Sequence, residues 1–167
     1  MKRSSLERFF YHREVKPREV PWYRLEKLPE ELPRPLILVN GCFDLFHYAH
    51  ARLLWAARAQ AGEKGTVLVA IDSDERVRQL KGVGHPILNW VERATMFNYM
   101  PVDGLMEFNS EDELEKIIWT LGPNLRVQGG DRSNLTSRFP EVPKMLITDT
   151  GLHTGMIIAR VLDRMAK

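Results

Sequence analysis

Two continuous apolar runs, at residues 36–39 (Leu-Ile-Leu-Val) and 66–71 (Thr-Val-Leu-Val-Ala-Ile), constrain the fold most strongly. A short run without polar alternation is typical of a strand that is buried on both faces. Weaker runs at 105–108, 125–128 and 145–148 predict three further strands. Strands buried on both faces need helices above and below them, so the pattern favours a parallel sheet that is covered on each side.

Helical patterns fill the intervals between these runs. After Tyr48, apolar residues recur at helix spacing until Gly62 ends the pattern. The segments that begin at Asn89 and Ser110 each start with the sequence of a capping box, and residues 154–165 predict a last helix. This alternation predicts an α/β fold, a Rossmann-like doubly wound parallel sheet in three α/β/α layers. Ligands of such sheets bind beyond the carboxyl ends of the strands, so functional residues are expected in the loops there.

The composition changes near residue 35. Residues 1–35 hold five of the ten prolines, with nine Lys or Arg against six Glu. They predict an irregular N-terminal arm that packs on the domain of residues 36–167 or on a second subunit. Proline at this density excludes long helices. A nucleic-acid-binding module that uses this basic, aromatic-rich arm is an alternative function.

Charge, cysteine content and apolar runs bear on nucleic-acid binding, on the redox setting and on membrane insertion. The net charge of +2 is too small to indicate nucleic-acid binding by itself. Cys42 is the single cysteine and cannot form an internal disulfide, which favours a reducing, cytoplasmic setting. We expect neither a signal peptide nor a membrane span, because no apolar segment follows the basic start and no apolar run approaches ~20 residues.

The loop after the first run carries the strongest functional signal. Residues 40–50 read Asn-Gly-Cys-Phe-Asp-Leu-Phe-His-Tyr-Ala-His, and Gly41 permits a sharp turn beside a ligand. His47 and His50 are three residues apart at a helix start, so both imidazoles lie on one face. Free N–H groups at that helix start suit a phosphate. Ordinary helix histidines or a zinc site are the alternatives, although zinc needs at least a third ligand.

Other loops hold candidates that each have a structural alternative. Lys81 is either a phosphate ligand or a solvated lysine, and Arg93 is either a bidentate phosphate clamp or a surface ion pair. The Gly-Gly-Asp at residues 129–131 suits a flat base but also an ordinary turn. Thr154 could meet phosphates or simply cap its helix. Asp72 and Asp74 follow the second run and are either acceptor contacts or solvated carboxylates.

The string Gly-x-Phe-Asp-x-x-His-x-x-His resembles the signature of the cytidylyltransferase-like nucleotidyltransferases, which is His-x-Gly-His. Segments at 70–74, 80–87, 127–131 and 150–158 are similar, in order, to further motifs of that superfamily. They resemble the heptose 1-phosphate adenylyltransferases most, and the glycerol-3-phosphate cytidylyltransferases next.

The resemblance implies that a substrate phosphate attacks the α-phosphorus of a nucleoside triphosphate and releases pyrophosphate. It assigns the catalytic role to His47, His50 and Lys81. The nucleotide-binding residues that it implies are Asn40, Gly41, Cys42, Phe43, Arg93, Gly129, Gly130, Asp131, His153 and Thr154. The acceptor contacts that it implies are Asp44, Asp72, Asp74 and His85, with a turn-capping role as the alternative for Asp44. Mg²⁺ is expected on the triphosphate rather than on protein ligands, and the expected assembly is a homodimer.

The sequence departs from the family pattern at four positions. Ala49 replaces the usual glycine between the histidines, His85 replaces an arginine, and His153 and Gly155 replace two hydroxyl residues. Thr148 stands where cytidylyl members carry an arginine, so ATP with heptose 1-phosphate or a similar sugar phosphate is the first choice. CTP with glycerol 3-phosphate is the alternative. A catalytically reduced nucleotide-binding protein is a further one.

Overall fold

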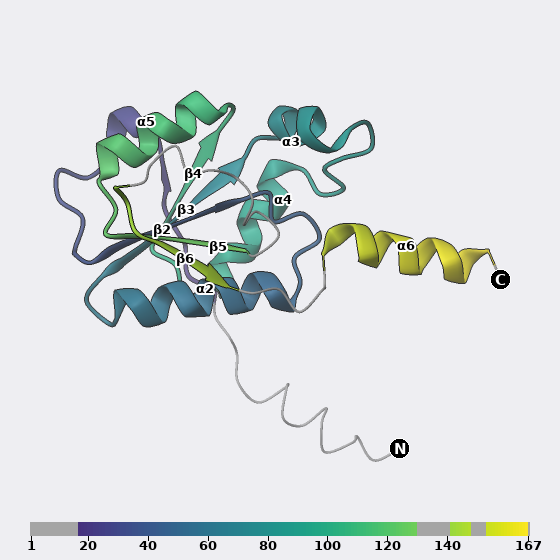
Figure 1. Cartoon of the computed structure of the whole chain (residues 1–167), viewed down its shortest axis with the longest axis horizontal. Helices are drawn as coiled ribbons and strands as arrows, with labels where there is room; N and C mark the ends of the chain where they lie inside the picture. The colour runs from purple at the N-terminus through teal and green to yellow at the C-terminus, as the bar shows by residue number, and fades with distance from the viewer. Residues whose placement is uncertain (1–16, 130–140, 148–152, 167) are drawn as a thin grey trace, which may run out of the picture.

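The computed structural model describes residues 17–129, 141–147 and 153–166, which form a six-stranded parallel sheet with helices on both faces (Figure 1). The elements, in chain order, are β1 (Trp22–Tyr23), η1 (Leu25–Lys27), β2 (Leu36–Gly41), α2 (Tyr48–Ala61), β3 (Thr66–Asp72), α3 (Asp74–Lys81), α4 (Trp90–Thr95), η2 (Met96–Tyr99), β4 (Gly104–Phe108), α5 (Glu111–Leu121), β5 (Leu125–Gly129), β6 (Lys144–Ile147) and α6 (Thr154–Met165). The strand order is β1-β4-β3-β2-β5-β6. The Rossmann-like fold class expected from the sequence is confirmed.

Alternate residues of the central strands supply two separate cores. Ile37 and Val39 of β2 pack in a cluster with α2 and α4, while Leu36 and Leu38 pack with α5 on the other face. Successive side chains of a strand point to opposite faces, so a fully apolar strand feeds both layers. Figure 1 shows α5 and α2 on opposite sides of the sheet.

Helix α3 was not expected from the sequence. Ser73 caps it, accepting a hydrogen bond from the Arg76 backbone N–H at 3.1 Å. Val77 is its one buried residue, so the helix lacks the apolar periodicity that sequence analysis detects. The capping box at Asn89 is present, but the one at Ser110 is only half formed.

Helix α6 extends away from the rest of the molecule (Figure 1). Thr154 is its one buried residue, and Val161, Leu162 and Met165 are more than half exposed. Among the described residues, neither α6 nor another helix combines the length and apolarity that a membrane crossing requires.

The described part of the arm packs on the domain. Its strand β1 pairs in parallel with β4, with Trp22 opposite Leu105, so it forms an edge of the sheet. Val20 lies in the core, and Arg18 donates to the carbonyls of Met100 at 2.8 Å and Val102 at 3.0 Å. The proline-rich sequence did not indicate a strand here.

Gly104 tests how tightly the arm is packed. A Cβ atom at Gly104 would lie 2.4 Å from a ring carbon of Tyr23 and 2.8 Å from a methyl of Leu68. We expect Gly104→Ala to lower the free energy of unfolding by about 1–3 kcal/mol, because overpacking forces neighbours out of place. Denaturant unfolding measures the loss. Adding Tyr23→Ala should relieve part of the crowding, so the double variant should lose less stability than the sum of the losses of the two single variants. A loss equal to that sum would contradict this packing.

Candidate active site

The predicted site residues of β2 and β3 gather at the carboxyl edge of the sheet. In the sheet, β2 lies between β3 and β5. The chain runs from β2 outward through β3 and β4 on one side and then returns to β5 on the other side, so the strand order reverses at β2. Such a reversal opens a crevice beyond the carboxyl ends. The loop from β2 to α2 and the amino ends of α3, α4 and α6 all start at or near this edge.

The loop after β2 is bent by two residues in the left-handed region. Phe43 has φ 54° and Leu45 has φ 47°, which non-glycine residues adopt uncommonly. They flank Asp44, and the chain then enters α2 with His47 as the N-cap residue. Strained backbone of this kind concentrates at functional sites.

The two motif histidines lie against one another. Their rings stack with centroids 3.8 Å apart and an angle of 24° between the planes. The His47 backbone N–H donates to Nδ1 of His50 at 3.4 Å. Burial lowers the pKa of His50 to about 3, and the charges of His47 and Lys81 add to the effect. His50 is therefore neutral at pH 7, and because Nδ1 accepts a hydrogen bond from the His47 backbone N–H, Nε2 carries the ring hydrogen.

Asp44 is turned into the protein. Its side chain is fully buried, and its carboxylate accepts from the backbone N–H groups of Ile87 at 3.0 Å and Leu88 at 3.1 Å. Nδ1 of His85 lies 3.5 Å from the same carboxylate. Burial by itself would raise the pKa of Asp44, but the hydrogen bonds from Ile87 and Leu88 outweigh it and lower the pKa. This placement differs from the predicted acceptor contact because protein donors occupy the carboxylate.

Arg93 is also fully buried. Nη1 donates to the Cys42 carbonyl at 2.6 Å, Nη2 to the Asp72 carbonyl at 2.8 Å and to the Asp74 carboxylate at 2.7 Å. Nε donates to the Leu88 carbonyl at 3.1 Å. Four of the five N–H donors of a guanidinium are thus used within the protein. The predicted phosphate clamp differs from this arrangement, in which Arg93 joins the ends of β2 and β3.

Comparison with known proteins agrees with this geometry. The sequence model of the family described as cytidylyltransferase-like matches residues 38–145, which include both histidines and the ends of β2 and β3. The chain belongs to the cytidylyltransferase-like family. The family that the motifs predicted is thereby confirmed.

Two relatives of this cytidylyltransferase-like chain carry the name bifunctional protein HldE. That of Helicobacter pylori (strain Shi470) is 31% identical over 149 residues, which is 87% of this chain and 31% of the relative. That of Citrifermentans bemidjiense is 36% identical over 138 residues, which is 78% of this chain and 28% of the relative. The chain therefore spans about three tenths of the length of these curated relatives.

Two solved structures share the fold. The lipopolysaccharide core biosynthesis protein from Thermoplasma volcanium GSS1 has a TM-score of 0.54 at 18% identity, covering 71% of this chain and 98% of its own. The macrolide-efflux protein from Streptococcus pneumoniae has a TM-score of 0.63 at 17% identity, covering 86% of this chain and 57% of its own. At such identity these likenesses establish the fold alone.

The neutral state of His50 predicts a pH dependence of stability in this cytidylyltransferase-like domain. Its folded pKa of about 3 lies below the ordinary 6.5, so the unfolded chain binds the extra proton below pH 6.5. The free energy of unfolding should therefore fall as the pH drops from 6.5 towards 3, by about 1.4 kcal/mol at pH 5.5 from this group. Denaturant unfolding at pH 7.5 and 5.5 measures it. His50→Gln should lose less stability over that interval, and equal losses would refute the burial of a neutral imidazole.

The other predicted residues are distributed as follows. Lys81 is exposed at the end of α3, and its charge reaches the site, where it influences the pKa of Cys42, Asp44 and His50. Burial raises the pKa of the Cys42 thiol. The side chain of Asn40 accepts from Gln128 at 3.0 Å, and Gly129 ends β5. Gly130 and Asp131 lie outside the described residues, as does Thr148.

Carboxylates at the end of β3 differ in exposure. The Asp72 side chain is fully buried and pairs with Arg76 at 2.7 Å, whereas the Asp74 side chain is about one third exposed. Of the two, Asp74 is the one that a solvent-side ligand can reach. Across residues 17–129, 141–147 and 153–166, no group of three His, Cys, Asp or Glu side chains is placed to hold a metal.

Helix α6 enters the site at its amino end. Thr154 donates its hydroxyl to the Asp44 carbonyl at 2.7 Å, and His153 is the N-cap residue. A Cβ at Gly155 would lie 3.3 Å from Nδ1 of His153, which is tighter than ordinary contact. The two departures at 153 and 155 are therefore linked, because the glycine makes room for the imidazole.

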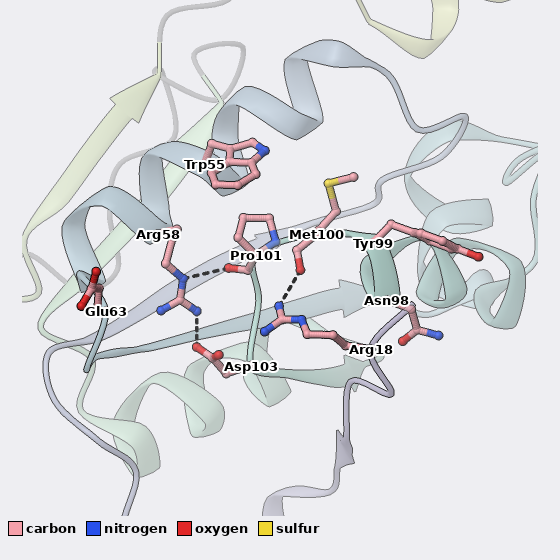
Figure 2. Close-up of a pocket in the computed structure, with 9 residues that line it drawn as sticks. All are labelled: Arg18, Trp55, Arg58, Glu63, Asn98, Tyr99, Met100, Pro101 and Asp103. Carbon is pink, nitrogen blue, oxygen red and sulfur yellow. Dashed lines mark hydrogen bonds and ion pairs between the residues drawn. The ribbon is translucent and has the colours of Figure 1, made fainter. Parts of the chain in front are cut away.

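A hollow of about 510 Å³ lies away from these residues, at the amino edge of the sheet (Figure 2). It is lined by Arg18, Trp55, Arg58, Glu63, Asn98, Tyr99, Met100, Pro101 and Asp103. Figure 2 shows Arg58 directed at Asp103 and at the Pro101 carbonyl, and these contacts hold the end of α2 to the start of β4. None of the predicted site residues lines this hollow.

Sequence analysis missed the main-chain groups of Ile87 and Leu88, which bind the buried Asp44 and Arg93. It also missed the left-handed residues Phe43 and Leu45. Hydrogen bonds to main-chain atoms leave no signal in side-chain identity, and a left-handed Phe or Leu is not signalled as a glycine would be.

Proposed function

We propose that the protein transfers AMP from ATP to a phosphorylated sugar of the heptose 1-phosphate type and releases pyrophosphate. The observation that carries the proposal is the stacked pair of His47 and His50 at the start of α2, with His50 neutral and its Nε2 available as a donor. Free N–H groups at a helix start, together with such a donor, suit a phosphate that gains charge in the transition state.

The chemistry needs alignment rather than a base. An oxygen of the acceptor phosphate attacks the α-phosphorus, the bond to the β-phosphate oxygen breaks, and pyrophosphate leaves with the electron pair. The acceptor is already ionised, so no proton has to be removed. His50 donates to the phosphate, and the charge of Lys81 offsets the charge that builds on the leaving group. Mg²⁺ enters as part of the substrate, bound to the triphosphate.

The choice of ATP rests on two segments that resemble the adenylyl group, the Lys81 loop and residues 129–131. The HldE relatives cover this part of the chain and support the same choice. CTP with glycerol 3-phosphate is the second candidate. A nucleotide-binding protein without turnover is the third, favoured by Ala49 and by the linked pair of His153 and Gly155. A cytoplasmic location and a homodimer remain predictions from the sequence.

Pyrophosphate release tests the proposal. The protein is incubated with Mg²⁺ and either ATP or CTP, each with a panel of sugar 1-phosphates and with glycerol 3-phosphate. We expect release with ATP that depends on a sugar 1-phosphate and is lost in His47→Ala. Release with CTP and glycerol 3-phosphate alone would establish the second candidate. Nucleotide binding without release under any pairing would establish the third.

A further inference from the structure

We infer that Asp44 and Arg93 act together as a positioning clamp that closes on the backbone of one residue, Leu88, in the loop between α3 and α4. The clamp sets the position of the loop that begins at Lys81. As a statement about turnover, this inference rests on the proposed function. As a statement about the loop and its response to nucleotide, it does not.

The two charged groups bind different backbone groups of Leu88. The Leu88 backbone N–H donates to Oδ1 of Asp44 at 3.1 Å, and the Leu88 carbonyl accepts from Nε of Arg93 at 3.1 Å. The N–H of Ile87 donates to both oxygens of the same carboxylate, at 3.1 and 3.0 Å. Both side chains are fully buried, so water does not compete for these hydrogen bonds. Charged partners make them stronger than neutral ones.

The same two residues also bind the strand ends. Arg93 donates to the carbonyls of Cys42 and Asp72, which end or follow β2 and β3. Asp44 accepts the Thr154 hydroxyl on its carbonyl, so α6 is attached at the same point. Asp44, which lies in the loop that leads into α2, is thus hydrogen-bonded to both the α3–α4 loop and the start of α6.

The position of the loop matters because of Lys81. This lysine is the last residue of α3 and is exposed, and the loop of residues 82–89 starts directly after it. Its charge acts on the pKa of His50 and Asp44, so it lies near the site, and among the described residues no hydrogen bond fixes it there. A displacement of about 1 Å at a charged group can cost ~100-fold in rate. A loop released from Asp44 would allow that displacement.

Asn in place of Asp44 keeps the size and removes the clamp. An amide has one acceptor oxygen, and its NH₂ group would face the donors of Ile87 or Leu88. Asp103 supplies a matched control. Its carboxylate also accepts a backbone N–H, that of Val67 at 2.8 Å, and pairs with an arginine, but it lies at the opposite edge of the sheet.

The experiment compares the whole wild-type protein with Asp44→Asn and Asp103→Asn. Steady-state kinetics give kcat and KM, calorimetry gives ATP affinity, and amide hydrogen exchange follows residues 82–88 with and without MgATP. For Asp44→Asn we expect kcat at least 30-fold lower, exchange at residues 82–88 at least tenfold faster, and loss of the slowing that MgATP causes there. For Asp103→Asn we expect lower thermal stability, with kcat within twofold and loop exchange unchanged.

The outcomes separate the two proposals. If the wild type turns over but Asp44→Asn loses no more kcat than Asp103→Asn, the clamp is refuted and the transferase stands. If the wild type binds MgATP but turns over no acceptor, the transferase fails, and loop exchange decides the clamp. Unchanged exchange at residues 82–88 in Asp44→Asn overturns the inference in either case.

Discussion

We expect His50→Asn to lower kcat for nucleotidyl transfer by about 10³-fold, whereas His50→Gln should lower it by only about tenfold. The reason is the way in which the imidazole is held. Its Nδ1 accepts the His47 backbone N–H at 3.4 Å, and its Nε2 then carries the proton that would meet the phosphate in the proposed function. Glutamine places an amide donor near the Nε2 position, while asparagine reaches only the Nδ1 position.

Pyrophosphate release at saturating nucleotide measures both variants of His50. Each is first checked for cooperative unfolding, so that a loss of folded protein is not counted as a loss of rate. Asparagine retains the contact with the His47 backbone and glutamine retains the donor, so the pair separates the two functions of one ring. Equal rates for the two variants would exclude Nε2 as the donor to the phosphate.

We expect Arg93→Met to lower the free energy of unfolding by about 3–5 kcal/mol, because it leaves a carboxylate and three carbonyls without their buried cation. Those acceptors are Asp74 and the carbonyls of Cys42, Asp72 and Leu88. Methionine retains the apolar stem, so the loss reports on the guanidinium. Urea unfolding followed by circular dichroism measures the loss of stability. We also expect kcat to fall under conditions in which the variant is still folded, since two of the acceptors lie at the strand ends of the site.

Arg78→Met serves as the control for this substitution. Arg78 lies on α3 and pairs with Glu75, with both side chains about half exposed or more. Exposed pairs contribute about 0–1 kcal/mol. A change of similar size in the two variants would mean that Arg93 does not hold the strand ends together.

The central strands of the sheet could be predicted from the sequence because they are buried on both faces. Residues 36–39 and 66–71 lie within β2 and β3, since an uninterrupted apolar run has few other places in a folded domain. The two-residue β1 has no such run, and prolines surround it. Its pairing with β4 depends on long-range contacts of Val20 and Tyr23 that no local pattern encodes.

Residues of the candidate site could be predicted from the sequence where their role depends on the type of side chain and its spacing. Spacing alone placed His47 and His50 on one face of a helix start, and the structure brings their rings together. Arg93 and Asp44 were assigned to ligands because arginine and aspartate commonly bind phosphate and substrate. Their observed partners are mostly main-chain atoms, which every residue has, so the sequence could not distinguish a group that binds ligand from one that binds the protein. The expected contacts of Gly130 and Asp131 stay predictions.

The short strand β1 has a consequence for solubility and association. It covers the outer edge of β4, where Pro21 accepts the Leu105 N–H at 2.9 Å. An uncovered edge of this kind is a template for strands of other molecules, and proline with very short strands is a common protection against it. A chain shortened to begin at residue 36 would lose that cover along with the aromatic ring over Gly104. We therefore expect such a chain to form intermolecular sheets and to precipitate at concentrations where the whole chain stays dispersed.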